Sequence, residues 1–366
     1  YFGIRWRALA VPVLLMYLAL GGAVYGVMRL WANRWLAAAG TLTALLPAPV
    51  LALLPQLRDF GRAAFIAGAL LAVAHLMRAP AKRGRWWGTA AALGAFCGVG
   101  YGFREDTVIA IPLALAGFAI LAPLEGTWRW ARRLGAMGVF AGAFLLAASP
   151  TLTGREAPGG TMWHYALLGL PASETNKIGF GNCAYDYATC LDDSYLADMA
   201  DRTRRRWTEN TEAPGWMLTE AEARGSIRYI ESIAWHFPAD LCARGISAVL
   251  HVLGQGSGLP RGLALFGAGW ILLALGLLAW RNGGMVWKAG GIGAYFLAIS
   301  AINPGFRHIF YLYIIPVAGL AYVVQCLLDA VCRKKDDTPP RKTHPRHLAL
   351  LAALGLACVG IFGGTC

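Results

Sequence analysis

Long apolar runs separated by short polar loops dominate the chain. A helix needs about 20 apolar residues to cross the hydrocarbon core of a bilayer, and about ten segments come close to that length. These candidate spans are 8–30, 35–54, 60–77, 86–103, 107–124, 131–149, 260–280, 284–301, 308–331 and 347–364. Pro47 and Pro49 mean that 35–54 could instead enter and leave the bilayer on one side. The pattern predicts an all-α polytopic membrane protein.

One long polar stretch divides the predicted spans into two groups. Residues 150–259 separate the transmembrane helices of 1–149 from those of 260–366. Within this stretch the apolar periodicity predicts helices at about 192–206, 219–235 and 238–253. A second polar tract, 333–346, mixes prolines with charges and is typical of a linker.

Composition supports a membrane protein. Hydrophobic residues make up 57% and charged residues 14% of the chain, and the mean hydropathy is +0.49. Soluble domains carry about a quarter charged residues. The net charge of +13 comes mainly from basic residues in short loops, which is a topology signal. The sequence therefore predicts membrane lipids, and no nucleic acid, as partners.

Lysine and arginine favour one set of alternate loops, which predicts the orientation. The loops rich in lysine and arginine are 29–34, 78–85, 129–133, the loop with Arg281, and 333–346. The loops poor in these residues hold only Arg58, Arg62, Arg104 and Arg307, beside Arg5 and Arg7 at the amino terminus. Loops rich in these residues stay on the cytoplasmic side. Residues 150–259 are then external, as is the amino terminus, and we expect at least one helix to precede Tyr1.

Three remote loops carry charged residues to the predicted outer boundary. They are "PQLRDFGRAAF" (55–65), "GFREDT" (102–107) and "NPGFRHIFYLY" (303–313). Ionisable groups at membrane depth are costly and usually pair or line a polar cavity. The candidate site residues are Arg58, Asp59, Arg104, Glu105, Asp106, Arg307 and His308. The alternatives are solvated loops, with Asp106 as a helix cap and His308 as a packed interfacial side chain.

The same stretches carry a family resemblance. "LPQLRDFGRAAF", "GVGYGFREDTVIAIPLAL" and "FRHIFYLYIIP" resemble bacterial membrane glycosyltransferases of the GT-C fold that use lipid phosphosugars. The matching positions are Arg58, Asp59, Arg104, Asp106, Arg307 and His308. Two departures stand out: residues 62–65 read Arg-Ala-Ala-Phe where the family favours Lys-Ala-Pro-Phe, and Glu105 replaces a commonly neutral residue.

The resemblance implies that a sugar is transferred from a polyprenyl phosphate to an acceptor at the outer face of the bacterial cytoplasmic (inner) membrane. Residues 150–259 would then be periplasmic. The family's general base lies in the first external loop, which we expect upstream of Tyr1, so no catalytic base is assigned. Arg104 and Arg307 are the candidates for binding the leaving phosphate, because a guanidinium fork matches phosphate geometry.

The carboxylates near those arginines could serve several purposes. Asp59, Glu105 and Asp106 could orient the arginines, bind sugar hydroxyls or hold a divalent cation. No metal ligands are assigned, because one pair of carboxylates is weak evidence for a metal.

Two other functions remain open. One is a non-catalytic scaffold subunit of a larger membrane complex, since a fold does not fix a function. The other is a transporter or lipid flippase, for which paired broken helices and ionisable residues near the bilayer midplane are expected.

The external stretch also holds two nearby cysteines. Cys183 and Cys190 lie in a segment rich in aromatic and amide residues (163–195). An external location would be oxidising, so we expect these two residues to form a disulfide.

Overall fold

The computed structural model describes residues 6–78, 83–123, 129–153, 220–254, 267–302 and 310–332, which are helical and contain no strand. The predicted all-α class is therefore confirmed. Four helical stretches are long and apolar enough to cross a membrane: Ala10–Arg29, Phe60–Arg78, Arg129–Thr153 and Phe310–Val331. Gly267–Arg281 is a shorter apolar helix. The chain is thus a helical membrane protein, and the bundle of about ten spans stays a prediction.

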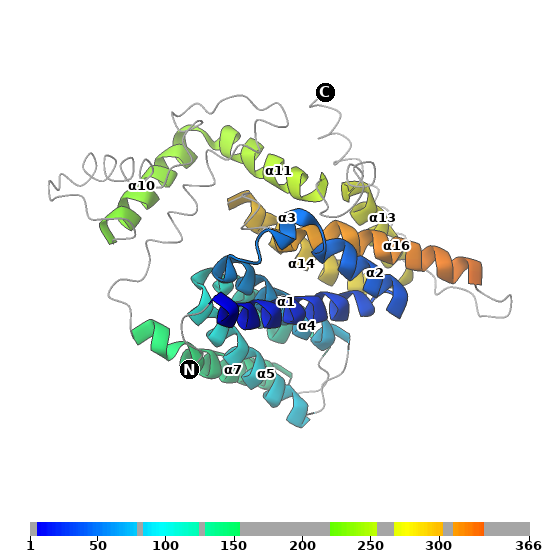
Figure 1. Cartoon of the computed structure of the whole chain (residues 1–366), viewed down its shortest axis with the longest axis horizontal. Helices are drawn as coiled ribbons and strands as arrows, with labels where there is room; N and C mark the ends of the chain where they lie inside the picture. The colour runs from blue at the N-terminus through cyan, green and yellow to red at the C-terminus, as the bar shows by residue number, and fades with distance from the viewer. Residues whose placement is uncertain are drawn as a thin grey trace.

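The first half of the chain forms a compact group of helices (Figure 1). These are α1 (Trp6–Arg29), α2 (Arg34–Leu45), α3 (Ala48–Leu51), α4 (Leu57–Arg78), α5 (Arg83–Phe103) and α7 (Arg129–Thr153). The predicted span 35–54 is not one continuous helix. Pro47 restricts Leu46 and has no N–H to donate, so α2 ends there and the short α3 begins after it.

The predicted span 107–124 is also irregular. It starts as a 3₁₀-helix, η1 (Glu105–Ile109), continues as α6 (Ala110–Ala116) and closes as a π-helix, η2 (Gly117–Leu121). Short π segments are rare and often occur at functional sites. Arg133 donates hydrogen bonds to the carbonyls of Phe118 and Ala122 and so caps the end of η2.

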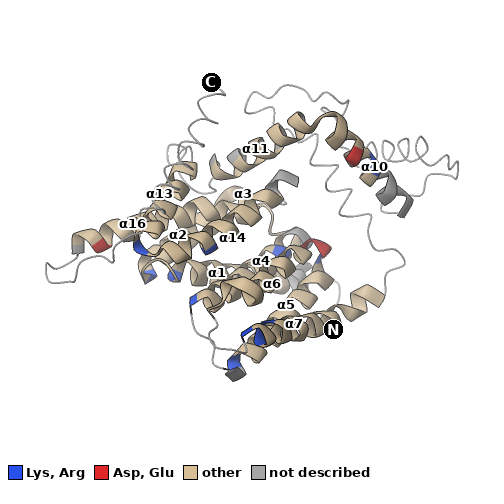
Figure 2. Cartoon of the chain, turned by 180° about the vertical axis from the view of Figure 1, so that it is seen from behind, with Lys and Arg blue, Asp and Glu red and all other residues tan. Residues whose placement is uncertain are grey.

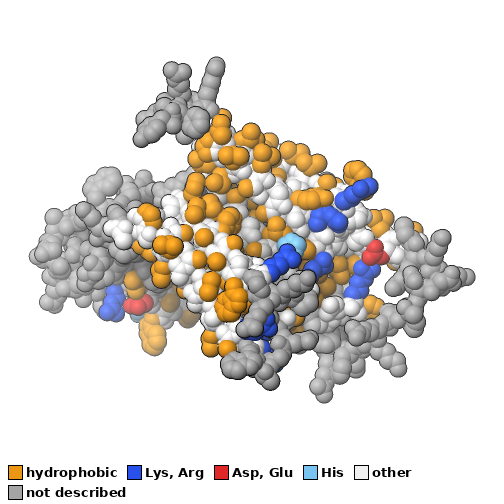
Figure 3. All heavy atoms as spheres, turned by 90° about the horizontal axis from the view of Figure 1, so that it is seen from below, with side chains coloured by type: hydrophobic (Ala, Val, Ile, Leu, Met, Phe, Trp, Pro, Cys, Tyr) orange, Lys and Arg blue, Asp and Glu red, His pale blue; other side chains and the backbone are white. Residues whose placement is uncertain are grey.

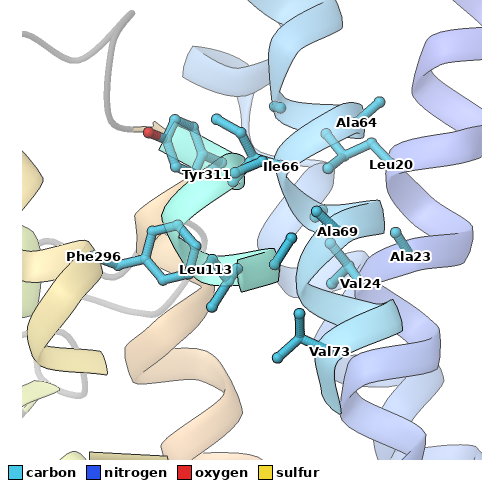
Figure 4. Close-up of a cluster of buried hydrophobic side chains, with 14 of the residues drawn as sticks. Leu20, Ala23, Val24, Ala64, Ile66, Ala69, Val73, Leu113, Phe296 and Tyr311 are labelled. Atoms are coloured by element: carbon cyan, nitrogen blue, oxygen red, sulfur yellow. The ribbon is translucent and has the colours of Figure 1, made fainter. Parts of the chain in front are cut away.

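Helix α4 lies at the centre of the apolar core. Figure 4 shows it between α1 and α6, with Phe296 and Tyr311 approaching from the side opposite α1. Many of the core-facing residues of α4 are small or branched, such as Ala64, Ala69 and Val73, and are almost fully buried. Small side chains let neighbouring helices approach closely, which is how helices associate without a hydrophobic driving force in lipid.

Two glycines explain the close packing of α5 against α7. A Cβ atom at Gly94 would lie 2.3 Å from the carbonyl oxygen of Phe140, and one at Gly98 would lie 2.6 Å from that of Phe144. Their spacing of four residues places both on one face of α5. Any larger residue there would push the two backbones apart.

Part of the second half of the chain lies alongside this group (Figure 1). Its described elements are α10 (Glu220–His236), α11 (Pro238–Gly254), α13 (Gly267–Arg281), α14 (Gly283–Ile302), η4 (Phe310–Tyr313) and α16 (Ile314–Cys332). Helices α10 and α11 match the predicted helices 219–235 and 238–253 within one residue at each end. The predicted helix 192–206, Cys183, Cys190, the linker 333–346 and the span 347–364 lie outside the described residues.

Candidate functional site

Two arginines and one aspartate from separate elements meet at one end of α4. Nη1 of Arg62 lies 2.5 Å from Oδ2 of Asp106, and Nε of Arg104 lies 2.8 Å from the same oxygen. We call Arg62, Arg104 and Asp106 the charged cluster. It joins α4, the end of α5 and the start of η1. Figure 2, in which the ribbon is coloured by residue type, shows acidic and basic positions near each other at this end of α4.

The local backbone explains why Arg104 and Asp106 lie so close together. Helix α5 ends at Phe103, and Arg104 adopts extended angles (φ −159°, ψ 132°) before η1 begins. The N–H of Arg104 still donates to the carbonyl of Gly100 at 3.0 Å, and the carbonyl of Arg104 accepts from Thr107 N–H at 3.0 Å. The chain therefore reverses tightly, which places Asp106 beside Arg104.

Gly100 makes this reversal possible. A Cβ atom there would lie 2.7 Å from Cγ2 of Thr107 and 2.8 Å from Cγ of Phe65. The absence of a side chain lets η1 fold back against both α5 and α4. The "GYGFRED" stretch thus positions the charged cluster through a glycine as well as through its charged residues.

The charged cluster is largely buried. The side chains of Arg62 and Arg104 are 3% and 4% exposed, and that of Asp106 is 17% exposed. Removing charges from water is costly unless each has a partner of opposite sign. One carboxylate oxygen here is shared by two guanidinium groups, so the three side chains together carry more positive than negative charge. The small exposed part of the cluster belongs mainly to Asp106.

An aromatic ring from the last third of the chain lies against the charged cluster. The guanidinium carbon of Arg62 lies 5.9 Å from the ring centroid of Tyr311 in η4, within the range of a cation–π contact. Beside it, the rings of Phe60 and Phe310 stack with centroids 5.7 Å apart. Element η4 is thereby held against α4, so the third predicted loop region does contribute to this site.

Helix α14 is tied to the same end of the bundle. The hydroxyl of Tyr295 donates to the carbonyl of Ile109 at 2.7 Å, where η1 passes into α6. Thr107 is fully buried beside it, and within the described residues its hydroxyl has no hydrogen-bond partner. The turn that carries Asp106 is therefore held by contacts with α4, α5 and α14.

The predicted site residues fall into three groups. Arg104 and Asp106 are brought into contact, while Glu105 is the half-buried first residue of η1. Arg58 and Asp59 lie in the first turn of α4, and their side chains are outside the described part of the structure. Arg307 and His308 lie outside the described residues altogether.

Arg62 is the contact that sequence reasoning did not single out. It was named for the orientation and as a departure from the family pattern but not as a site residue, yet it makes the shorter of the two contacts with Asp106. A signal was present: Arg62 follows Arg58 by four residues on one face of a helix, inside an otherwise apolar run. A charge in that position usually has a partner.

Metal binding finds no support among the described side chains. No group of three or more His, Cys, Asp and Glu residues is gathered there as metal ligands would be. What the cluster offers chemically is two arginine forks fixed beside each other, an arrangement suited to binding an oxyanion.

Comparison with known proteins adds no identification. No family model matches the chain, and no curated protein or solved structure matches it either. The resemblance to GT-C glycosyltransferases therefore depends on the three quoted stretches, and any function is inferred from the charged cluster.

Proposed function

We propose that the protein transfers a sugar from a polyprenyl-phosphate donor to an acceptor at the outer face of the membrane, and that Arg62 and Arg104 bind the donor's phosphate. The observation that carries this proposal is the sharing of one Asp106 oxygen by two buried guanidinium groups. The proposal adds Arg62 to the phosphate-binding residues predicted from the sequence, and it keeps Arg307 as one of them.

The chemistry of the leaving group explains why two arginines suit this reaction. When the sugar departs, negative charge develops on the phosphate oxygens. Donors that are fixed before the reaction stabilise this charge without reorganising, and removing one typically costs a hundredfold or more in rate. Asp106 contacts both arginines and so holds their forks in place, while Tyr311 limits the movement of Arg62.

The location at helix ends fits a donor held in the bilayer. Arg62 lies near the start of α4 and Arg104 just after the end of α5. A polyprenyl chain could remain in the lipid while its phosphate reaches this boundary. A transporter is expected to place such groups nearer the middle of its spans.

The burial of the charged cluster also favours a second candidate. In a non-catalytic scaffold subunit, the same ion pairs would serve only to lock α4, α5 and η1 together. The two functions differ in what a conservative change does. Lysine keeps the charge of arginine but loses its fork, so it affects phosphate binding more than ion pairing.

The test is donor consumption in membranes, measured beside thermal stability. We expect Arg104→Lys and Arg62→Lys each to lower turnover about a hundredfold while most of the stability remains. Arg281→Lys is the matched control, because Arg281 forms a 2.8 Å ion pair with Asp329 in α16, remote from the charged cluster. Full turnover in both cluster variants would reject the phosphate role. No turnover by the unmodified protein with any of a panel of polyprenyl donors would favour the scaffold.

The outward orientation is part of the same proposal and has its own test. Single cysteines introduced at 78–85 and at 155–160 can be treated in intact cells with a thiol reagent that does not cross membranes. We expect labelling at 155–160 and protection at 78–85. The reverse pattern would place the charged cluster on the cytoplasmic side and exclude transfer at the outer face.

A further inference from the structure

The end of the bundle opposite the charged cluster is strongly basic. We call it the basic end, and its described cationic residues are Arg29, Arg34, Arg78, Arg85, Arg129, Arg132, Arg133, Arg281 and Lys288. Among the described residues, Asp329 is its one acidic side chain. Figure 3 shows Lys and Arg side chains gathered toward one side of a largely hydrophobic surface.

Some of these cations serve the fold. Arg133 caps the carbonyls of η2, and Nζ of Lys288 donates to the carbonyl of Leu121 at 2.5 Å. Arg281 is paired with Asp329. These contacts fix the ends of several helices relative to one another, so the basic end is a preorganised surface.

Arginines at this end also lie over exposed tryptophans, and the guanidinium carbon of Arg133 is itself 5.5 Å from the ring centroid of Trp130. The guanidinium carbon of Arg34 is 5.0 Å from the ring centroid of Trp35, and that of Arg129 is 5.9 Å from that of Trp130. Both arginines are exposed, and the indoles are 73% and 58% exposed. Arg78 is likewise exposed and lies 4.8 Å from the ring of Trp31.

An exposed Arg–Trp pair suits the headgroup region of a bilayer. The indole is amphipathic and favours the membrane–water interface. A guanidinium stacked over it keeps its charge, and its fork suits bidentate contact with a phosphate. Trp280 and Trp287, 51% and 56% exposed, extend the aromatic residues along the same end.

We propose that the basic end binds anionic phospholipid headgroups, and that the Arg34–Trp35 and Arg129–Trp130 pairs each bind a lipid phosphate. The charge of the described residues at this end is complementary to an anionic leaflet, and the lipids beside the bundle supply the phosphates. This proposal is independent of sugar transfer, because it concerns the end of α1, α4 and α16 remote from the charged cluster.

The test is native mass spectrometry of the purified full chain with phosphatidylglycerol or phosphatidylcholine of matched acyl chains. We expect more phosphatidylglycerol to stay bound, and its retention to fall several-fold in the double variant Arg34→Gln/Arg129→Gln. Higher salt should weaken retention, because exposed charges are screened. Arg228→Gln is the control, since Arg228 is also exposed but lies on α10.

A second variant tests whether the tryptophans of the two Arg–Trp pairs contribute to lipid binding. Trp35→Ala/Trp130→Ala keeps every charge, and we expect an intermediate loss of phosphatidylglycerol. Because all four side chains are exposed, helicity and thermal stability in detergent should stay close to those of the unmodified protein. Equal retention of the two lipids by the unmodified protein, or full phosphatidylglycerol retention by the arginine double variant, would overturn the proposal.

Discussion

Replacing Asp106 with asparagine should destabilise the protein far more than an ordinary loss of an ion pair. The change removes the shared negative charge and leaves the Arg62 and Arg104 side chains, 3% and 4% exposed, close to each other. Breaking a buried ion pair by removing one partner costs about 3–5 kcal/mol. Since the Asp106 side chain is itself 17% exposed, we expect the lower end, about 3 kcal/mol.

The assay is reversible unfolding in mixed micelles, followed by helicity. Glu231→Gln is the matched control, because Glu231 pairs with Arg228 at 3.4 Å on the surface with both side chains more than half exposed. Exposed pairs contribute little, so this control should lose less than about 0.5 kcal/mol. In a double variant, Arg62→Met should recover part of the Asp106→Asn loss, because one buried cation is then removed. Equal small losses of unfolding free energy in Asp106→Asn and Glu231→Gln would refute the idea that the buried ion pairs of the charged cluster stabilise the fold.

Two further predictions concern packing and one hydrogen bond. Gly98→Ala should cost about 1–3 kcal/mol in free energy of unfolding, because its Cβ would lie 2.6 Å from the backbone oxygen of Phe144. Gly88→Ala, on the same helix with open space around it, should be neutral or stabilising by up to about 1 kcal/mol, and a matching loss in both would contradict the packing argument. Tyr295→Phe removes the 2.7 Å hydrogen bond to Ile109 and should cost about 1 kcal/mol in the same assay; an unchanged midpoint would mean that this bond does not hold α14.

Helix positions followed well from the sequence where the apolar pattern was long and regular. Helices α1, α4, α7 and α14 begin and end within a few residues of the predicted spans. The surface helices α10 and α11 were predicted almost to the residue, because Pro238 marks the start of the second. Hydrophobic periodicity fixes which segments are helical, since backbone groups in lipid must be satisfied within the segment.

The irregular segments were harder to predict, because their form depends on neighbours. The segment 105–121 has ordinary apolar composition, yet it forms three kinds of helix in succession. Its π end is capped by Arg133, a residue of another helix. Such tertiary contacts override local propensity and leave little trace in a single sequence.

The site was predictable as a location but not as a set of contacts. Charges flanking apolar runs pointed to the boundary where Arg104 and Asp106 meet. The partner of Asp106 on α4 was not evident, because both Arg58 and Arg62 lie in the first two turns of α4 and only packing selects between them. Gly100, which permits the reversal at Arg104, carries no charge and gave no signal on its own.

Direct binding of a lipid phosphate tests the proposed function most directly. The purified protein would be offered a polyprenyl phosphate and the corresponding polyprenol, with bound lipid measured by native mass spectrometry. We expect the phosphate to be retained, the alcohol to be lost, and retention of the phosphate to fall at least tenfold in Arg62→Lys/Arg104→Lys but not in Arg281→Lys. Equal retention of the two lipids, or an unchanged preference in the double variant, would contradict the assignment of the charged cluster as a phosphate site.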